Sequence, residues 1–178
     1  MSRTTFITIV IFILIVIAGI CIVKYNHLAS LDEAVEMAWN PLEGKLKERY
    51  ASIPRLVPEV TLYVGHEVPE VKDLANIEPS VTGSSSIQDK VTAANKLEKD
   101  LTSVMQMLSE RYPGIISGHQ FDVIIKIRQN TDKTIGNDVK KLNDAVTEYN
   151  TYVRRFPNDL VALILVFPHK YEYFQPEE

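Results

Sequence analysis

Residues 135–156 read IGNDVKKLNDAVTEYNTYVRRF, and they indicate the fold more clearly than any other part of the chain. Apolar side chains recur here at alternating steps of four and three residues: Ile135, Val139, Leu142, Val146, Tyr149, Val153 and Phe156. This heptad spacing places them along one side of an α-helix, as in coiled coils. We therefore expect a long packed helix that Pro157 ends.

Two upstream stretches show the same helical period. The first stripe is Leu28, Leu31, Val35, Ala38, Leu42 and Leu46. The second is Val91, Ala94, Leu97, Leu101, Val104 and Leu108, with Asp89 and preceding serines as possible N-cap groups. Pro41 would bend the first helix, or Asn40 would mark a break in it. Together these stripes predict an all-α fold, an antiparallel bundle of about four helices.

The region between these helices contains several proline and glycine residues. The apolar stripe over residues 53–74 predicts a kinked or segmented helix, with Pro54 at a helix start. Pro58 and Pro69 would each remove an interior hydrogen bond. Residues 76–86, NIEPSVTGSSS, are predicted to form a loop.

Residues 6–23, FITIVIFILIVIAGICIV, carry no charge. Eighteen residues lie near the lower end of the roughly 17–25 needed to cross a hydrocarbon core as a helix. A cleaved signal peptide and a lipoprotein anchor at Cys21 are the alternatives. Lipoprotein processing usually needs a small residue before the cysteine, and Ile20 is a poor fit there. We expect a retained transmembrane helix within residues 1–24 and a helical domain over residues 25–178, with the lipid bilayer as one partner.

The side of the membrane that holds this domain is weakly indicated. Arg3 precedes the apolar stretch and Lys24 follows it, which slightly favours a cytoplasmic N-terminus. Near the other end, residues 160–167 are apolar but too short to span a bilayer as a helix. They would form a short packed helix or an interfacial segment.

Charge and cysteine content exclude some classes of protein. The net charge is −4, and because Arg3 is one of the 19 basic residues, 18 remain against 23 acidic ones in the rest of the chain. An acidic domain argues against non-specific nucleic-acid binding. The single cysteine, Cys21, excludes an intramolecular disulfide and leaves the redox compartment open.

Few residues suggest chemistry. His66 and Glu67 resemble the start of a zinc-protease HExxH motif, but Glu70 stands where the second histidine belongs. A metal ion held by these three side chains, and with it a hydrolase, is the weaker interpretation; capping or solvent-facing polar groups are the stronger one. We expect no catalytic residues, no metal and no cofactor.

Two Tyr-Asn pairs, Tyr25-Asn26 and Tyr149-Asn150, favour a structural role, because asparagine within a heptad seam fixes helix register. Ligand binding is the alternative. Trp39 is expected to anchor the core. Four arginines are candidates for binding anionic lipid headgroups, with a solvated surface as the stronger interpretation: Arg49, Arg55, Arg154 and Arg155.

An ordered set of short motifs resembles the LemA family. In the first half these are Tyr25-Asn26, Ala38-Trp39, Arg49 followed by Ile53-Pro54-Arg55-Leu56-Val57, and His66-Glu67. In the second half they include Tyr112-Pro113, Tyr149-Asn150, Phe156-Pro157, Leu160-Val161-Ala162 and Tyr173-Phe174. The resemblance covers about residues 25–174 and implies a helical bundle, a bacterial membrane location and no established enzyme activity.

The chain departs from the family pattern at several positions. Arg55 stands where the family usually has asparagine, and Asp132 where its last helix usually has glutamate. Leu142-Asn143 stands where a further Tyr-Asn is expected. The ending, residues 172–175, also resembles the MamQ branch of magnetosome membranes.

The expected function is a non-enzymatic scaffold or adaptor in the bacterial inner membrane, with unidentified protein partners. It would present a rigid helical surface at a fixed distance from the bilayer. Membrane remodelling in an organelle such as the magnetosome is the alternative.

Overall fold

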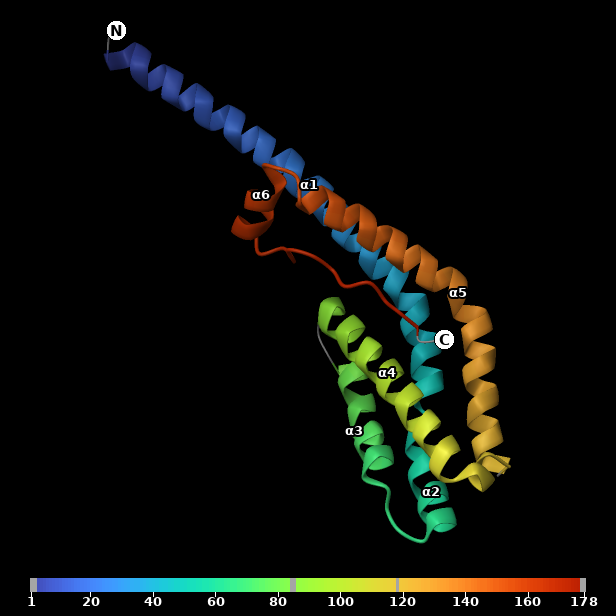
Figure 1. Cartoon of the computed structure of the whole chain (residues 1–178). Helices are drawn as coiled ribbons and strands as arrows, with labels where there is room; N and C mark the ends of the chain where they lie inside the picture. Colours follow the sequence, from blue (N-terminus) through green and yellow to red (C-terminus); the bar gives the residue numbers. More distant parts are fainter. Residues whose placement is uncertain (1–2, 84–85, 118, 177–178) are drawn as a thin grey trace. The chain divides into compact units, whose positions relative to one another are not determined.

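The computed structural model describes residues 3–83, 86–117 and 119–176, with all side chains in these ranges except those of residues 6, 77–83, 116, 117, 119–121, 123, 124 and 127. Its elements are α1 (Arg3–Tyr50), η1 (Ile53–Arg55), α2 (Leu56–Val64), α3 (Pro69–Gly83), α4 (Ile87–Arg111), η2 (Pro113–Ser117), α5 (His119–Val153) and α6 (Asn158–Ile164). No strand occurs among these residues (Figure 1). The predicted all-α class is confirmed.

The chain forms two compact units. Unit 1 comprises Met1–Val35 and Ala145–Tyr171, and unit 2 comprises Glu36–Asp144 and Glu172–Glu178. Both α1 and α5 contribute residues to each unit.

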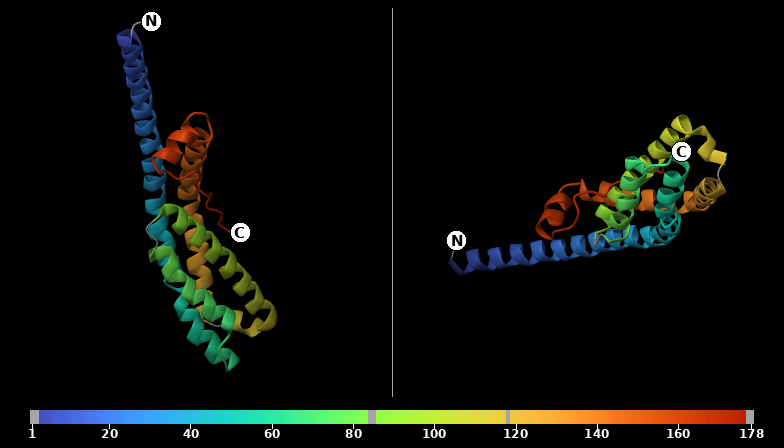
Figure 2. Two further views of the ribbon diagram at one scale, coloured as in Figure 1. Left: turned by 90° about the vertical axis from the view of Figure 1, so that its left-hand side faces the viewer. Right: turned by 90° about the horizontal axis from the view of Figure 1, so that it is seen from below.

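Ion pairs give the helix directions in unit 2. Along α1, Lys45 pairs with Asp138 and Arg49 with Asp132, so residue numbers fall on α5 as they rise on α1. These two helices are therefore antiparallel. Glu43 pairs with Lys90 and Arg49 with Glu98, so residue numbers on α4 rise as they rise on α1. Helix α4 therefore runs parallel to α1. With α3 packed beside α4 (Figure 2), unit 2 has the four long helices that were expected.

The predicted stripes form most of the core. All six residues of the 91–108 stripe are buried, and so are five of the six in the 28–46 stripe, Ala38 being half-buried. On α5 the seam is buried from Ile135 to Val153. The prediction for Phe156 is wrong: α5 ends at Val153, and the Phe156 side chain is 80% exposed.

Proline acts differently from expectation at Pro58 and Pro69, and at Pro41 one of the two expected outcomes is excluded. Helix α1 continues through Pro41, so the break at Asn40 is wrong; Trp39 and Leu42 are both fully buried on either side of it, and their packing holds the helix together. The segmented structure over residues 53–74 is confirmed.

Pro54 lies in the first turn of η1, as predicted. Pro58 lies in the first turn of α2 and Pro69 begins α3, so neither removes an interior hydrogen bond as was predicted. Gly65, with φ of 81°, ends α2 in the left-handed conformation that glycine adopts without strain.

The loop expected at residues 76–86 is mostly wrong. Helix α3 continues to Gly83, and residues 84 and 85 lie outside the described part of the chain. Ser86 is the N-cap of α4, and its side chain accepts a hydrogen bond from the Asp89 backbone N–H. Packing of α3 against α4 outweighs the weak helix propensity of serine, threonine and glycine here.

Unit 1 joins the start of α1 to the end of α5, α6 and the extended segment that follows it. Leu28, Leu31 and Val35 of α1 are buried, and the Tyr171 hydroxyl donates a 2.6 Å hydrogen bond to Asp32 Oδ1. The apolar residues of α1 from Ile7 to Val23 are exposed, in contrast. This is the one helical segment of the described chain that is long and apolar enough to cross a membrane.

Candidate functional site

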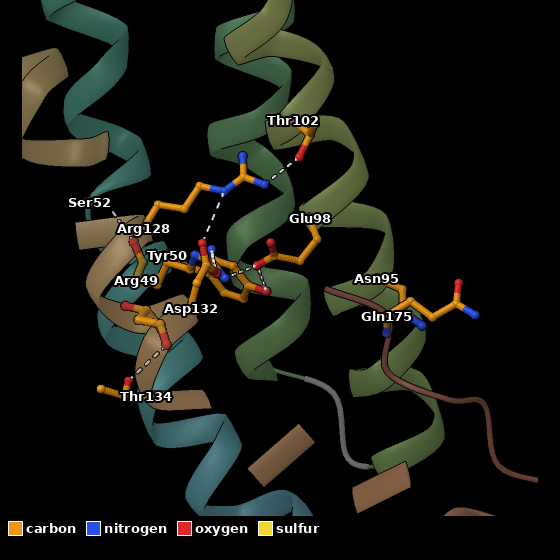
Figure 3. A network of polar contacts seen from close by, with 11 residues as sticks. Arg49, Tyr50, Ser52, Asn95, Glu98, Thr102, Arg128, Asp132, Thr134 and Gln175 are labelled. Atoms are coloured by element: carbon orange, nitrogen blue, oxygen red, sulfur yellow. Dashed lines mark hydrogen bonds and ion pairs between the residues drawn. The ribbon is translucent and has the colours of Figure 1, made fainter. Parts of the chain in front are cut away.

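Unit 2 contains a cluster of buried charged groups around Arg49, at the C-terminal end of α1 (Figure 3). The Arg49 side chain is 2% exposed. Its Nη1 donates to Glu98 Oε1 on α4 over 3.1 Å, and its Nη2 donates to Asp132 Oδ1 on α5 over 2.5 Å. One guanidinium group therefore connects three helices, and its planar fork suits two carboxylates at once.

Glu98 is the most deeply buried member of the cluster, at 0% exposure. Its Oε1 atom also accepts a 2.8 Å hydrogen bond from the Tyr50 hydroxyl. Burial raises the pKa of the Glu98 carboxyl, and the Arg49 guanidinium opposes that rise only in part. Burial likewise raises the pKa of Tyr50 far above its usual range, so this hydroxyl remains a donor.

Arg128 and Asp132 complete the cluster on the side of α5. Asp132 is 42% exposed, and its Oδ2 lies 4.0 Å from Arg128 Nε, the i,i+4 pair that the sequence suggested. Arg128 also donates to the Thr102 hydroxyl over 2.9 Å. Two arginines balance two carboxylates, so the cluster is neutral and meets solvent through Asp132. We name the set Arg49, Tyr50, Glu98, Arg128 and Asp132 the ion cluster.

A second buried carboxylate, Glu43, lies one and a half turns before Arg49 on α1. Its carboxylate accepts a 2.8 Å hydrogen bond from the Trp39 indole and pairs with Lys47 and Lys90 over 2.7 and 3.1 Å. Burial would raise the pKa of Glu43, but the hydrogen bonds from these three side chains outweigh it and hold the pKa below 4.5. Trp39 is fully buried, as expected of a core anchor.

Sequence reasoning missed both buried glutamates. Glu98 lies four residues after Ala94 and three before Leu101, so it shares their helix face; Glu43 likewise follows Trp39 by four. A carboxylate in an apolar stripe was the available signal, because it must find a cationic partner when buried.

Side-chain amides hold the extended C-terminal segment in unit 2. Asn143 on α5 accepts from the Phe174 N–H and donates to the Phe174 carbonyl, both over 3.0 Å. Asn95 on α4 donates to the Tyr173 carbonyl. It also accepts from the N–H of Gln175, which lies beside it in Figure 3. Since this segment is in neither helix nor sheet, the amides satisfy backbone groups that have no other regular partner.

The same arrangement recurs in unit 1. Asn150 on α5 bonds both the N–H and the carbonyl of Tyr171, over 2.8 and 2.9 Å. The Tyr149 hydroxyl donates to the Pro168 carbonyl over 2.6 Å, and its ring meets that of Tyr171 edge-on at 4.8 Å. This Tyr-Asn pair therefore anchors the C-terminal segment, which differs from the helix-register role that the heptad seam suggested.

A sequence model of the LemA family matches residues 38–178, which is 141 of the 178 residues. The chain belongs to the LemA family. A search of curated proteins found no match to the chain.

Several residues that carry the LemA resemblance now have structural roles. Arg49 and Asp132, 83 positions apart, form one ion pair, and the aspartate that replaces the usual glutamate still reaches the guanidinium. Asn143 stands in the slot of a Tyr-Asn motif and bonds the Phe174 backbone here, with leucine in place of the tyrosine. Pro157 is the N-cap of α6. These LemA motif positions thus join helices or fix the C-terminal segment.

Other LemA motif residues lie on the surface. Asn26 is exposed and Tyr25 is 45% exposed, so the first Tyr-Asn pair does not act as the second does. His66 and Glu67 are exposed in the connection between α2 and α3, where Glu67 pairs with Lys72 over 2.9 Å. Among the described residues, no three histidine, cysteine or acidic side chains gather as metal ligands would.

The structure separates the four arginines that were candidates for binding lipid headgroups in this LemA chain. Arg49 is wrong as a candidate, because it is buried and engaged by two carboxylates. Arg55, Arg154 and Arg155 are exposed. Of these, Arg154 and Arg155 belong to unit 1, together with the apolar stretch of α1.

Asn143→Ala is expected to loosen the C-terminal segment of unit 2. The variant leaves the N–H and carbonyl of buried Phe174 without these two bonds, at a cost of about 1–3 kcal/mol. Hydrogen exchange followed by mass spectrometry should show faster exchange in peptides covering residues 172–176. Asn130→Ala, an exposed position on the same helix, is the matched control. Equal exchange in the two variants would contradict the anchoring role of Asn143.

Proposed function

We propose that this LemA protein is a non-enzymatic scaffold or adaptor held in the bacterial inner membrane by one N-terminal helix. The observation that carries the proposal is the exposed apolar surface of residues 7–23 in α1, followed by a helical domain whose buried charged side chains form ion pairs between helices. The domain offers a surface for protein partners, and α1 restricts it to the membrane.

The exposure of the N-terminal stretch supports the anchor. The exposed fractions of the large apolar side chains there run from 39% at Val10 to 66% at Phe12. An aqueous helix with apolar groups on all sides is unfavourable, whereas lipid satisfies both its side chains and its internally bonded backbone. Lys24 marks the end of the uncharged run.

The pairing of charged groups supports the proposal that the protein is not an enzyme. A catalytic acid, base or nucleophile needs reactive atoms free to meet a substrate. In the ion cluster, Arg49 is held by Glu98 and Asp132, and Glu98 Oε1 by Arg49 and Tyr50. Arg49 Nε and Glu98 Oε2 have no hydrogen-bond partner in the described part of the chain, but both atoms are buried away from any substrate in solvent. These groups are used in joining α1, α4 and α5, which suits a rigid domain for binding partners.

Removing residues 1–24 is expected to release the protein from membranes. After expression in bacteria and an alkaline carbonate wash, the full chain should stay in the membrane pellet and the truncated chain should appear in the supernatant. Far-UV circular dichroism of the released chain should be helical, which checks that truncation has not unfolded it. Truncated, helical protein that stays in the washed pellet would refute a single N-terminal anchor.

Partner binding is tested with the full chain. Affinity capture of tagged protein from native membranes is expected to recover one or more defined proteins, and loss of the same proteins with the truncated chain would show that the anchor brings them together. Recovery of the same background set as an unrelated single-pass protein would count against an adaptor.

Membrane remodelling in an organelle is the alternative. It rests on the resemblance of residues 172–175 to the MamQ branch, but these residues have packing roles: Phe174 is fully buried and Glu172 accepts from Thr92 over 2.9 Å. Deleting the gene and imaging the cells separates the two functions. An adaptor leaves intracellular membranes intact, and their loss would favour remodelling.

A further inference from the structure

Helix α6 and the residues around it expose an apolar surface in unit 1. We name six side chains the α6 patch: Phe156, Leu160, Leu163, Ile164, Leu165 and Val166. Their exposed fractions run from 40% at Leu165 to 89% at Val166, whereas Val161 and Ala162 on the other face are buried. So many apolar groups on one short segment are typical of a surface that contacts another apolar phase.

The local backbone adds to this exposure. Helix α6 ends at Ile164, and Val166 adopts φ of 60°, a left-handed conformation that is strained for a β-branched residue. That conformation leaves the Val166 side chain almost fully exposed. The exposed apolar side chains of this segment therefore do not contribute to the stability of the fold by burial.

Aromatic contacts fix this segment next to the end of the apolar stretch of α1. The Phe167 ring meets Tyr25 edge-on with centroids 5.7 Å apart. The Tyr152 ring, just before the segment, meets His27 at 4.5 Å and lies 5.4 Å from Lys24 Nζ. Residues 24–27 follow the uncharged run directly, so a bilayer spanned by α1 has its boundary at this level.

The charges around the patch fit a lipid surface. Arg154 and Arg155 are exposed just before it and Lys170 just after it, while Asp159 is the one acidic residue from Arg154 to Tyr171. Cationic side chains that flank exposed apolar ones match a headgroup layer with anionic lipids above hydrocarbon. Tyrosine rings at such a boundary are also favourable.

We infer that the α6 patch inserts into the boundary between headgroups and acyl chains of the bilayer that α1 crosses. The inference rests on the proposed membrane anchor and adds a second, monotopic contact to it. Seven helical residues are too few to span, so α6 lies in the interface, at a depth of roughly 5–10 Å. Lipid is favoured over a second protein copy because Phe167, which directly follows the patch, contacts Tyr25, two residues after the uncharged run of α1.

Spin labels on the full chain in vesicles test this placement. Cys21→Ser removes the sole cysteine, and single cysteines are then introduced as Leu14→Cys in α1, as Val166→Cys or Ile164→Cys in the patch, and as Gln129→Cys on the exposed face of α5. Vesicles contain zwitterionic lipid with or without one-third anionic lipid. Collision rates with oxygen, which is concentrated in lipid, and with a water-soluble nickel complex report the surroundings of each label.

Labels at residues 14, 164 and 166 are expected to collide several-fold more often with oxygen than with the nickel complex, and the label at residue 129 to do the reverse. Lipid-like behaviour at residue 14 with water-like behaviour at 164 and 166 overturns the patch insertion and leaves the anchor intact. Low collision rates with both reagents at 164 and 166 also overturn it, because protein then covers the patch. Water-like behaviour at residue 14 refutes the anchor itself.

Discussion

Arg49→Met is expected to destabilise unit 2 by about 3–5 kcal/mol, the usual cost of removing one partner from a buried ion pair. The substitution removes the cationic partner of Glu98, a side chain with 0% exposure, and it removes one ion pair of Asp132. The measurement is urea unfolding of the full chain in detergent micelles, followed by far-UV circular dichroism. The transition midpoint should fall with little change in the helical signal before it.

Two further variants test whether the loss comes from the orphaned carboxylate. Arg55→Met removes an exposed arginine six residues away and should change stability by less than about 0.5 kcal/mol. Adding Glu98→Gln to Arg49→Met removes the unpaired charge and keeps an acceptor for the Tyr50 hydroxyl, so it should restore much of the stability. If the double variant is no more stable than Arg49→Met, the unpaired Glu98 carboxylate is not the cause of the lost stability.

The effect of Arg49→Met should also depend on pH. Burial already raises the pKa of Glu98 above 4.5, and losing Arg49 raises it further. Between pH 4.5 and the raised native pKa, the Glu98 carboxyl is protonated in the native state and ionised in the unfolded state. The free energy of unfolding of the variant therefore falls as pH rises through this range. The gap between Arg49→Met and the unaltered chain should therefore narrow toward pH 4.5.

Trp39→Ala is expected to cost about 3–5 kcal/mol, since it leaves a large cavity in a fully buried position. It also takes a hydrogen-bond donor from Glu43, and it removes an edge-on ring contact with Phe174 at 6.5 Å. Urea unfolding should report the loss. Hydrogen exchange should show faster exchange in residues 172–176 as well, because Phe174 packs on this ring.

Met37→Ala is the matched control for Trp39→Ala, because Met37 lies on the same helix and is 61% exposed. Trp39→Phe separates the two contributions: it keeps most of the apolar volume and loses only the bond to Glu43, so its cost should be clearly smaller. A tryptophan that can be truncated without loss of stability would contradict its place in the core.

The helices were predictable where apolar periodicity is regular. The stripe of α4 and the seam of α5 up to Val153 are buried as expected, because side chains three and four residues apart must share a helix face. The errors occurred where packing outweighs local preference. Helix α1 continues through Pro41, and α3 extends to Gly83 in the stretch that was predicted to be a loop.

The ion cluster was predictable only in part. Arg49 and Asp132 were noted through the family resemblance, and Arg128 with Asp132 through their spacing, but nothing local joins residue 49 to residue 132. That contact depends on how α1 and α5 align in the fold. Glu98 escaped notice because charged residues are ordinarily assigned to the solvent face of an amphipathic helix.

Hydrogen exchange of the full chain in lipid nanodiscs tests the central claim most directly, since it reports the anchor and the helical domain together. We predict slow exchange over residues 6–23, from lipid, and over the parts of α4 and α5 that carry the buried stripes, from packing. Exchange within seconds over residues 6–23, as fast as in the exposed connection between α2 and α3, would contradict a membrane-anchored helical scaffold.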